Sequence, residues 1–245
     1  MIEMPPVEMI LPDWFSGIRF AFSLKEDGQM SFKRAANDAV IANRTRFLAA
    51  HQLLLDQVVA GELVHGSSVE IVTAKQVGRG ASGPDWIPGV DGLVTAEKNV
   101  LLLTTHADCS PLVIYDPVHN VIGQAHAGWR GLRAGIVEQL VTAIRSFNGT
   151  GPNQLKAWIG PTVRACCYPV GPEVVAQFPA ECQILVWGKQ MLDLARFIRM
   201  ELARLGFEPE AVTDSEICTS CSKEFSSFRR DGSATRAMAL VTGLK

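Results

Sequence analysis

The chain has 245 residues, a net charge of −2 from 23 basic and 25 acidic side chains, and 47% apolar residues. This composition predicts a soluble globular protein that can bury a core without disulfides or a structural metal. The balanced charge and the absence of a Lys or Arg run exclude the basic surface of a nucleic-acid binder. The most apolar stretch, residues 99–115, contains His106, Asp108 and Pro111, so no membrane span is predicted.

Periodic apolar positions predict the helices, and runs of aliphatic and β-branched residues predict the strands. Helical spacing occurs between residues 37 and 59, from 132 to 144 and from 194 to 205, where Gly206 fits a C-cap. Strands cluster at hairpin-like spacing with helices between the clusters, so the predicted fold class is α+β. We expect a single domain over residues 1–245, with mixed β-sheets covered by helices. In chain order, strands are expected at residues 69–73, 100–104, 112–115, 121–125, 156–159, 184–187 and 238–242.

Cysteine usage and the first residues both bear on the cellular compartment. Glu3 and Glu8 precede the first basic residue, Arg19, which does not match a secretory signal and predicts a cytoplasmic protein. The six cysteines are therefore interpreted as thiols or ligands rather than disulfides. Cys166, Cys167, Cys218 and Cys221 would in principle make a structural zinc site. A four-cysteine zinc site usually consists of two well-formed Cys-x-x-Cys pairs, and the adjacent Cys166 and Cys167 do not make such a pair. We therefore interpret these cysteines as reduced, partly buried thiols near the rim of the substrate pocket.

A G-x-G-x-x-G fingerprint at Gly78, Gly80 and Gly83 follows a predicted strand. A dinucleotide site needs a helix directly after these glycines, but Pro84 and Pro88 follow instead. We therefore expect a surface loop. The sequence also lacks the P-loop, zincin and serine-hydrolase signatures, and the H-x-E with P-C-x-x-C pattern of the zinc nucleobase deaminases.

Metal-competent side chains occur in three short polar interruptions between strands, at His65, Cys109 and His126. A hairpin that turns at residues 116–120 would return Cys109 and His126 to the same end of a sheet. Two neutral imidazoles and one thiolate suit zinc or copper, and three protein ligands leave an open position, as in catalytic sites. From spacing alone two alternatives to a metal site stay open. In the first, the three residues are an ordinary buried Cys and two hydrogen-bonded His without a metal. In the second, Cys109 is a nucleophile and His126 its base in a metal-free hydrolase or amidase.

The residues around these positions form a specific pattern. Residues 126–131 read H-A-G-W-R-G, preceded by A-D-C at 107–109 and V-H-G at 64–66. With these runs the chain resembles the YfiH-like family, also called the laccase-domain or multicopper polyphenol oxidase family, whose members are described as zinc-containing purine nucleoside phosphorylases. Further matching positions are 43–44, 91, 93–95, 159–161, 166–171, 192–194, 218–219, 225 and 229–232.

The resemblance implies a layered α/β/β/α fold in which His65, Cys109 and His126 bind zinc and Arg44 reaches the site near substrate. It implies phosphorolysis of adenosine, inosine, guanosine and methylthioadenosine with inorganic phosphate, and deamination of adenosine to inosine. Other labels in the family are copper-dependent polyphenol oxidation and peptidoglycan precursor editing. A multicopper oxidase needs several His-rich clusters, which five His residues make hard to build.

Phosphorolysis requires a cationic cradle, because a dianionic phosphate attacks the ribose C1′ as positive charge develops on the sugar. Arg44 is the first choice for this role and Arg130 the second, since a guanidinium offers paired donors to phosphate oxygens. The alternative for each is a surface ion pair. Asp108 either transfers protons to the purine or orients a ligand imidazole, and His106 has the same two interpretations.

Three segments depart from the family pattern. Leu63 replaces the Gln that usually stands two residues before the first ligand His, and residues 21–25 read A-F-S-L-K in place of T-T-R-G-G. Residues 225–230 read F-S-S-F-R-R in place of F-F-S-Y-R-R. We expect these changes to retain the metal ligands and to remodel the substrate pocket.

Overall fold

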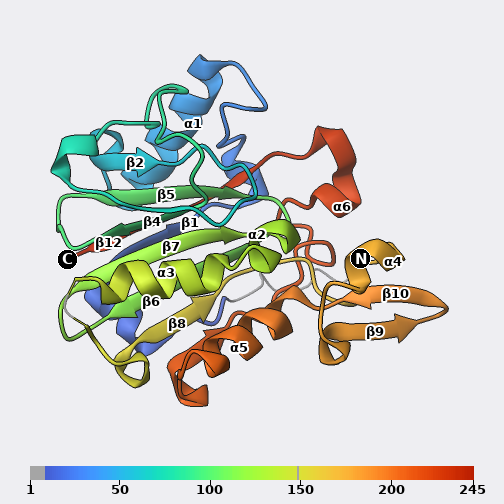
Figure 1. Ribbon diagram of the computed structural model, residues 1–245. Helices are drawn as coiled ribbons and strands as arrows, with labels where there is room; N and C mark the ends of the chain where they lie inside the picture. The colour runs from blue at the N-terminus through green and yellow to red at the C-terminus, as the bar shows by residue number, and fades with distance from the viewer. Residues whose placement is uncertain (1–8, 148) are drawn as a thin grey trace.

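The computed structural model describes residues 9–147 and 149–245, and its strands form two sheets that pack face to face (Figure 1). One sheet has the strand order β1-β12-β5-β2, the other has the order β11-β8-β6-β7-β4-β3, and β9 and β10 form a separate hairpin. The strands are β1 Ile18–Phe22, β2 Val58–Ala60, β3 Val69–Ile71, β4 Gly92–Thr95, β5 Leu101–His106, β6 Ser110–Asp116, β7 Val121–Ala127, β8 Lys156–Ile159, β9 Gln183–Val186, β10 Lys189–Leu192, β11 Val212–Asp214 and β12 Met238–Leu244.

Helices cover the outer faces of both sheets. Helix α1 lies on the four-stranded sheet, and α3 and α5 lie on the six-stranded sheet (Figure 1). Each sheet is mixed, because β2 pairs in parallel with β5, and β3 with β4, among antiparallel neighbours. The predicted α+β fold with mixed sheets in α/β/β/α layers is therefore confirmed. The helices are α1 Asn37–Ala50, α2 Trp129–Arg133, α3 Ile136–Arg145, α4 Pro172–Val175, α5 Leu194–Arg204 and α6 Phe228–Asp231.

The two-residue period of the central strands produces these layers, because successive side chains point to opposite faces of a sheet. On β5, Leu101 and Leu103 pack against α1, whereas Leu102 points between the two sheets. On β6, Leu112 packs toward α3 and Val113 points between the sheets. Strands that are apolar on both faces thus specify a sandwich covered on both sides.

Two of the three predicted helices differ from their expected extents. The helix expected over residues 37–59 ends at Ala50, because Gln52 adopts a left-handed conformation with φ of 59° and the chain then enters β2. The helix expected over residues 132–144 is split into α2 and α3 at Gly135, whose φ is 91°. Helix α5 follows the prediction and ends before Gly206, which also has a positive φ.

All seven predicted strands overlap observed ones. The strands β1, β2, β4, β10 and β11 were not expected, and each has only three to five residues. The G-x-G-x-x-G segment is a loop with left-handed Gly78 and Gly80, as predicted. In the described part of the chain, no helix combines the length and the apolar character that crossing a membrane requires.

Candidate active site

His65, Cys109 and His126 meet at one end of the two sheets. His65 lies in the connection from β2 to β3, and Cys109 lies in the connection from β5 to β6. Both connections cross from the four-stranded to the six-stranded sheet, and His126 lies near the end of β7. The candidate ligand atoms, one imidazole nitrogen from each His and the Cys109 Sγ, all lie within 4.8 Å of one another.

The hairpin of β6 and β7 brings Cys109 and His126 together. The two strands pair antiparallel with Pro111 opposite His126, so the predicted hairpin is confirmed. Cys109, which directly precedes β6, therefore lies beside Gly128, which directly follows β7. Alternation along β7 places His126 on the same face as Ile122, toward the space between the sheets.

The tautomer of His126 follows from its hydrogen bond. Its Nδ1 lies 2.8 Å from the Thr105 carbonyl oxygen, which can only accept, so Nδ1 carries the proton. The buried Nε2 finds no hydrogen-bond partner among residues 9–147 and 149–245. Burial, assisted by His65, lowers the pKa of His126 to about 4, so the ring is neutral at pH 7. A neutral imidazole with a free nitrogen is the form that binds a metal ion.

Asp91 positions both histidines. Its buried carboxylate accepts backbone N–H groups from Val64 at 3.1 Å, His65 at 2.9 Å and Gly66 at 2.7 Å. Its carbonyl oxygen accepts the His126 N–H at 2.8 Å. Sequence reasoning noted Asp91 only as a family match and assigned it no role. The sequence signal for this role was an acidic residue directly before an apolar strand, where its carboxylate can accept hydrogen bonds from N–H groups of a neighbouring loop.

His106 holds the peptide of Cys109. Its Nδ1 donates to the Cys109 carbonyl oxygen at 3.2 Å, so its Nε2 accepts the Thr104 hydroxyl at 2.8 Å. Burial keeps the pKa of His106 well below its ordinary value, and the neutral ring stacks on His126 with centroids 5.1 Å apart. Between the two interpretations from sequence, this geometry assigns His106 a positioning role.

Asp108 does not contact a ligand imidazole, in contrast to one of its two predicted roles. Its carboxylate accepts the Thr219 hydroxyl at 2.6 Å and the Arg229 backbone N–H at 2.6 Å, while the Thr105 carbonyl orients His126. The reason is local: Asp108 has a φ of 88°, in the crossing between the sheets. Asp108 directly precedes Cys109, so these two hydrogen bonds hold Thr219 and Arg229 close to a candidate ligand.

Arg44, expected as the leading phosphate ligand, uses most of its donors on backbone carbonyls. Its side chain is only 3% exposed. Nε and Nη2 donate to the Met30 carbonyl at 2.9 and 2.7 Å, and Nη1 donates to the carbonyls of Gly80 and Ala81 at 2.6 and 3.0 Å. Burial lowers its pKa to about 10. These bonds hold the loops of Met30 and of Gly80 together, and Arg44 also lines a cavity with Lys33 and Thr105.

Arg130 has the accessibility that Arg44 lacks. Its exposed guanidinium lies 4.3 Å from the ring centroid of Trp129 at the start of α2. Burial lowers the pKa of His65, and Arg130, Lys33 and Arg34 lower it further, although Asp91 acts in the opposite direction. Three cationic side chains therefore lie close enough to His65 to favour an anion beside it.

Two aromatic side chains accompany these cations. Burial raises the pKa of Tyr168 to about 12, with a contribution from Cys109, so Tyr168 lies near the candidate ligands. Arg229 lies 5.0 Å from the Tyr168 ring centroid, and Arg34 lies 5.5 Å from that of Phe228, whose side chain is 52% exposed. Flat aromatic faces beside guanidinium groups suit a planar, polar ring system.

Gly128 provides a direct test of this geometry. A Cβ at this position would lie 2.9 Å from the Cys109 Sγ and 3.3 Å from the His65 Cδ2. We expect Gly128→Ala to lower the metal affinity of this site by about 10–100-fold, the loss typical of a displaced ligand environment. Titration against a competing chelator measures it. Gly17→Ala is the matched control, since its Cβ would approach only the Tyr115 Oη, at 3.9 Å. Wild-type affinity in Gly128→Ala would contradict the assigned geometry.

Solved structures share this arrangement of elements. The structure titled hypothetical protein YfiH of Bacillus licheniformis superposes with a TM-score of 0.91 at 28% identity, covering 98% of this chain and 97% of that one. The YlmD structure of Geobacillus stearothermophilus gives a TM-score of 0.90 at 31% identity, covering 96% of this chain and 94% of that one.

Sequence comparison gives relatives over most of the chain. A protein named purine nucleoside phosphorylase YlmD of Geobacillus stearothermophilus is 36% identical over 215 residues, 83% of this chain and 78% of the relative. A purine nucleoside phosphorylase of Streptomyces coelicolor is 35% identical over 245 residues, 94% of this chain and 97% of the relative. The family described as multi-copper polyphenol oxidoreductase laccase matches residues 29–245. The chain therefore belongs to this family, in which YfiH and YlmD share its fold.

Proposed function

We propose that the chain is a zinc-dependent purine nucleoside phosphorylase that also deaminates adenosine. The observation that carries this proposal is the cluster of His65, Cys109 and His126, with ligand atoms within 4.8 Å of one another. The buried His126 Nε2 has no hydrogen-bond partner within the described residues, which leaves its lone pair available to a metal ion. The names of the relatives, purine nucleoside phosphorylases, support the class of substrate. Within that class we propose adenosine, inosine, guanosine and methylthioadenosine, with inorganic phosphate as the second substrate.

The donor set of two nitrogens and one sulfur fits zinc, with copper as the alternative. When bound, a zinc ion with an open position supplies Lewis acidity to the reacting groups. Burial raises the pKa of Cys109 to about 12, and Asp108 and Asp91 contribute to the rise. The thiol therefore holds its proton at pH 7 until a cation replaces it, which couples metal binding to proton release.

In the proposed phosphorolysis, the chain's own residues bind and orient the two substrates. Arg130, with Lys33 and Arg34, attracts phosphate, and Tyr168 and Phe228 offer faces for the purine. A phosphate oxygen forms a bond to C1′ while the bond from C1′ to the purine nitrogen breaks and the leaving base takes a proton. The products are the free base and ribose 1-phosphate, or 5-methylthioribose 1-phosphate when methylthioadenosine is the substrate.

The metal-free cysteine hydrolase is less compatible with this site. A nucleophilic thiolate needs a lowered pKa, usually beside a protonated His. Here burial raises the pKa of Cys109 to about 12 and lowers that of His126 to about 4. Without a cation the pair is neutral at pH 7, the opposite of an activated thiolate.

An assay with each purine nucleoside, with and without phosphate, tests the proposal by product identity. We expect sugar 1-phosphate and free base with phosphate, and inosine and ammonia from adenosine and water without it. Arg130→Gln should raise the KM for phosphate by about 10–100-fold, the loss of one or two charge-assisted hydrogen bonds, and should leave zinc content unchanged.

Arg133→Gln is the matched control, because Arg133 lies one turn further along and contacts the rings of Phe178 and Phe197 instead. It should keep the wild-type KM for phosphate. A zinc-loaded protein that forms no sugar 1-phosphate from any of the four nucleosides would refute the phosphorylase proposal. An unchanged KM in Arg130→Gln would refute the role of Arg130.

A further inference from the structure

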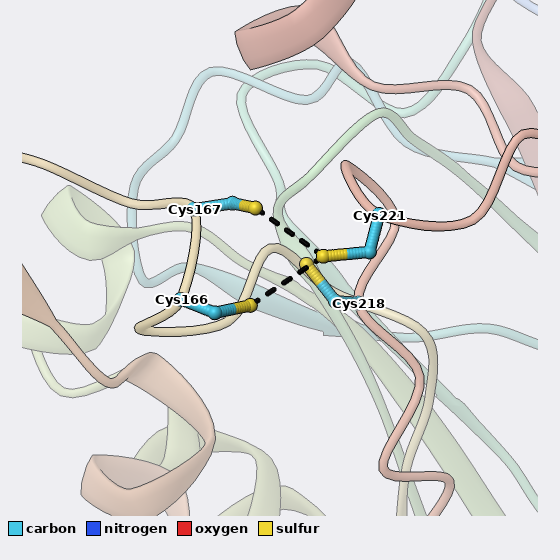
Figure 2. A group of neighbouring side chains, drawn as sticks. All are labelled: Cys166, Cys167, Cys218 and Cys221. Atoms are coloured by element: carbon cyan, nitrogen blue, oxygen red, sulfur yellow. Dashed lines mark hydrogen bonds between the residues drawn. The ribbon is translucent and has the colours of Figure 1, made fainter.

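A second cluster of metal-ligating side chains lies outside the candidate active site. Cys166 and Cys167 come from the loop after β8, and Cys218 and Cys221 come from the loop after β11. The four sulfur atoms point toward one another (Figure 2) and all lie within 4.8 Å of one another. Because neither loop contributes to the set of His65, Cys109 and His126, the two clusters are independent.

The sulfur spacing fits a shared ion better than a disulfide. The Cys221 Sγ lies 3.6 Å from the Cys166 Sγ and 3.3 Å from the Cys167 Sγ, whereas a disulfide bond measures about 2.05 Å. Four sulfurs placed tetrahedrally at about 2.3 Å from one zinc ion are about 3.8 Å apart. We propose that Cys166, Cys167, Cys218 and Cys221 bind a structural zinc ion as four thiolates.

The backbone around the cluster has the tight turns that such a site needs. The Cys167 N–H donates to the Arg164 carbonyl at 2.8 Å, and the Ser222 N–H donates to the Cys218 carbonyl at 3.0 Å. The first turn directs the sulfurs of both adjacent cysteines toward the second loop (Figure 2), an arrangement not predicted from the sequence.

Two arginines hold the backbone of the second loop. Each is also ion-paired with an aspartate, Arg164 with Asp214 and Arg230 with Asp231, so their role at the cluster is to fix the loop rather than to supply free positive charge. Arg230 Nη1 donates to the carbonyls of Thr219, Ser220 and Ser222 at 3.0, 3.3 and 2.9 Å, so its guanidinium encloses the second loop. Arg164 Nε donates to the Ile217 carbonyl at 3.3 Å, next to Cys218.

The site would join the two segments that form the rim of the candidate active site. Tyr168 directly follows Cys167, and Thr219 lies between Cys218 and Cys221. The Thr219 hydroxyl donates to Asp108 at 2.6 Å, next to Cys109. A zinc ion on the four sulfurs therefore holds the rim from outside and takes no part in the reaction.

Metal stoichiometry in defined variants tests the proposal. Protein purified under reducing conditions with zinc should carry two ions per chain by native mass spectrometry and elemental analysis. His65→Ala with His126→Ala should keep one ion, and X-ray absorption of that variant should show four sulfur ligands at about 2.3 Å. Cys166→Ser with Cys221→Ser should also keep one ion, and Cys182→Ala, which alters a buried cysteine elsewhere, should keep two.

The double histidine variant decides the question even if the cysteine variant does not fold. A folded His65→Ala, His126→Ala protein that binds no zinc, or binds it with nitrogen or oxygen ligands, would overturn the proposal. Disulfides between the two loops in protein kept under reducing conditions, or iron in place of zinc, would overturn it as well. Neither readout requires enzymatic turnover, so this test is separate from that of the proposed function.

Discussion

Replacing His65, Cys109 or His126 by alanine should remove one zinc ion per chain and abolish nucleoside phosphorolysis together. Each residue supplies one of three atoms that lie within 4.8 Å of one another, so two remaining ligands hold the ion much more weakly. Even outer partners of a metal site contribute about 10–100-fold to affinity or activity, and we expect a loss beyond this range. Elemental analysis and a phosphorolysis assay on the same preparation measure both quantities.

The controls use the same residue types at other positions. His51→Ala removes an exposed imidazole at the end of α1, and Cys182→Ala removes a thiol from the core; both should retain full metal content. Since the four-cysteine site would keep its own ion, the quantity to compare is the difference of one equivalent. Full occupancy in any of the three alanine variants would reject that residue as a ligand.

Asp91→Ala should weaken zinc binding by about 10–100-fold although Asp91 is not itself a proposed ligand. Its carboxylate accepts three N–H groups around His65, and its carbonyl accepts the N–H of His126. Loss of the carboxylate leaves the loop of His65, which has a φ of 61°, without the contacts that hold it. Stability should fall by about 3 kcal/mol, as for lost hydrogen bonds to a charged group.

A graded series separates this positioning role from general destabilisation. Asp91→Asn keeps one carbonyl oxygen as an acceptor and should recover part of the zinc affinity. Asp85→Ala is the matched control, because Asp85 also accepts a loop N–H, from Gly80 at 3.0 Å, but does not contact the site. Chelator competition and chemical denaturation measure the two effects. Wild-type zinc affinity in Asp91→Ala would show that the His65 loop is positioned by other contacts.

Sequence patterns predicted those parts of the fold that local physics determines. The hairpin of β6 and β7 was readable because two long apolar runs flank a polar turn of five residues. Short strands such as β2 and β11, with three residues each, were missed because their pairing depends on neighbours distant in the chain. The break at Gly135 was missed because the apolar period continues through α2 and α3, and only the observed φ reveals it.

In the candidate site, too, local sequence features were predictable and contacts between distant residues were not. Its three proposed ligands were identified from residue type and resemblance, and the hairpin accounts for the meeting of Cys109 and His126. The hydrogen-bond partners of Arg44 and Asp108 were not predictable, because a guanidinium or a carboxylate can bond to backbone groups as well as to substrate. Their partners lie far along the chain, Gly80 for Arg44 and Thr219 for Asp108, where local sequence patterns give no signal.

The two connections that carry His65 and Cys109 each cross from one sheet to the other, whereas His126 belongs to a strand. A gap between the layers would therefore pull the donor atoms apart, and neither sheet on its own can assemble them. The site can therefore bind an ion only after the two sheets have packed against each other. Zinc uptake during refolding would then report the docking of the two layers, later than the formation of either.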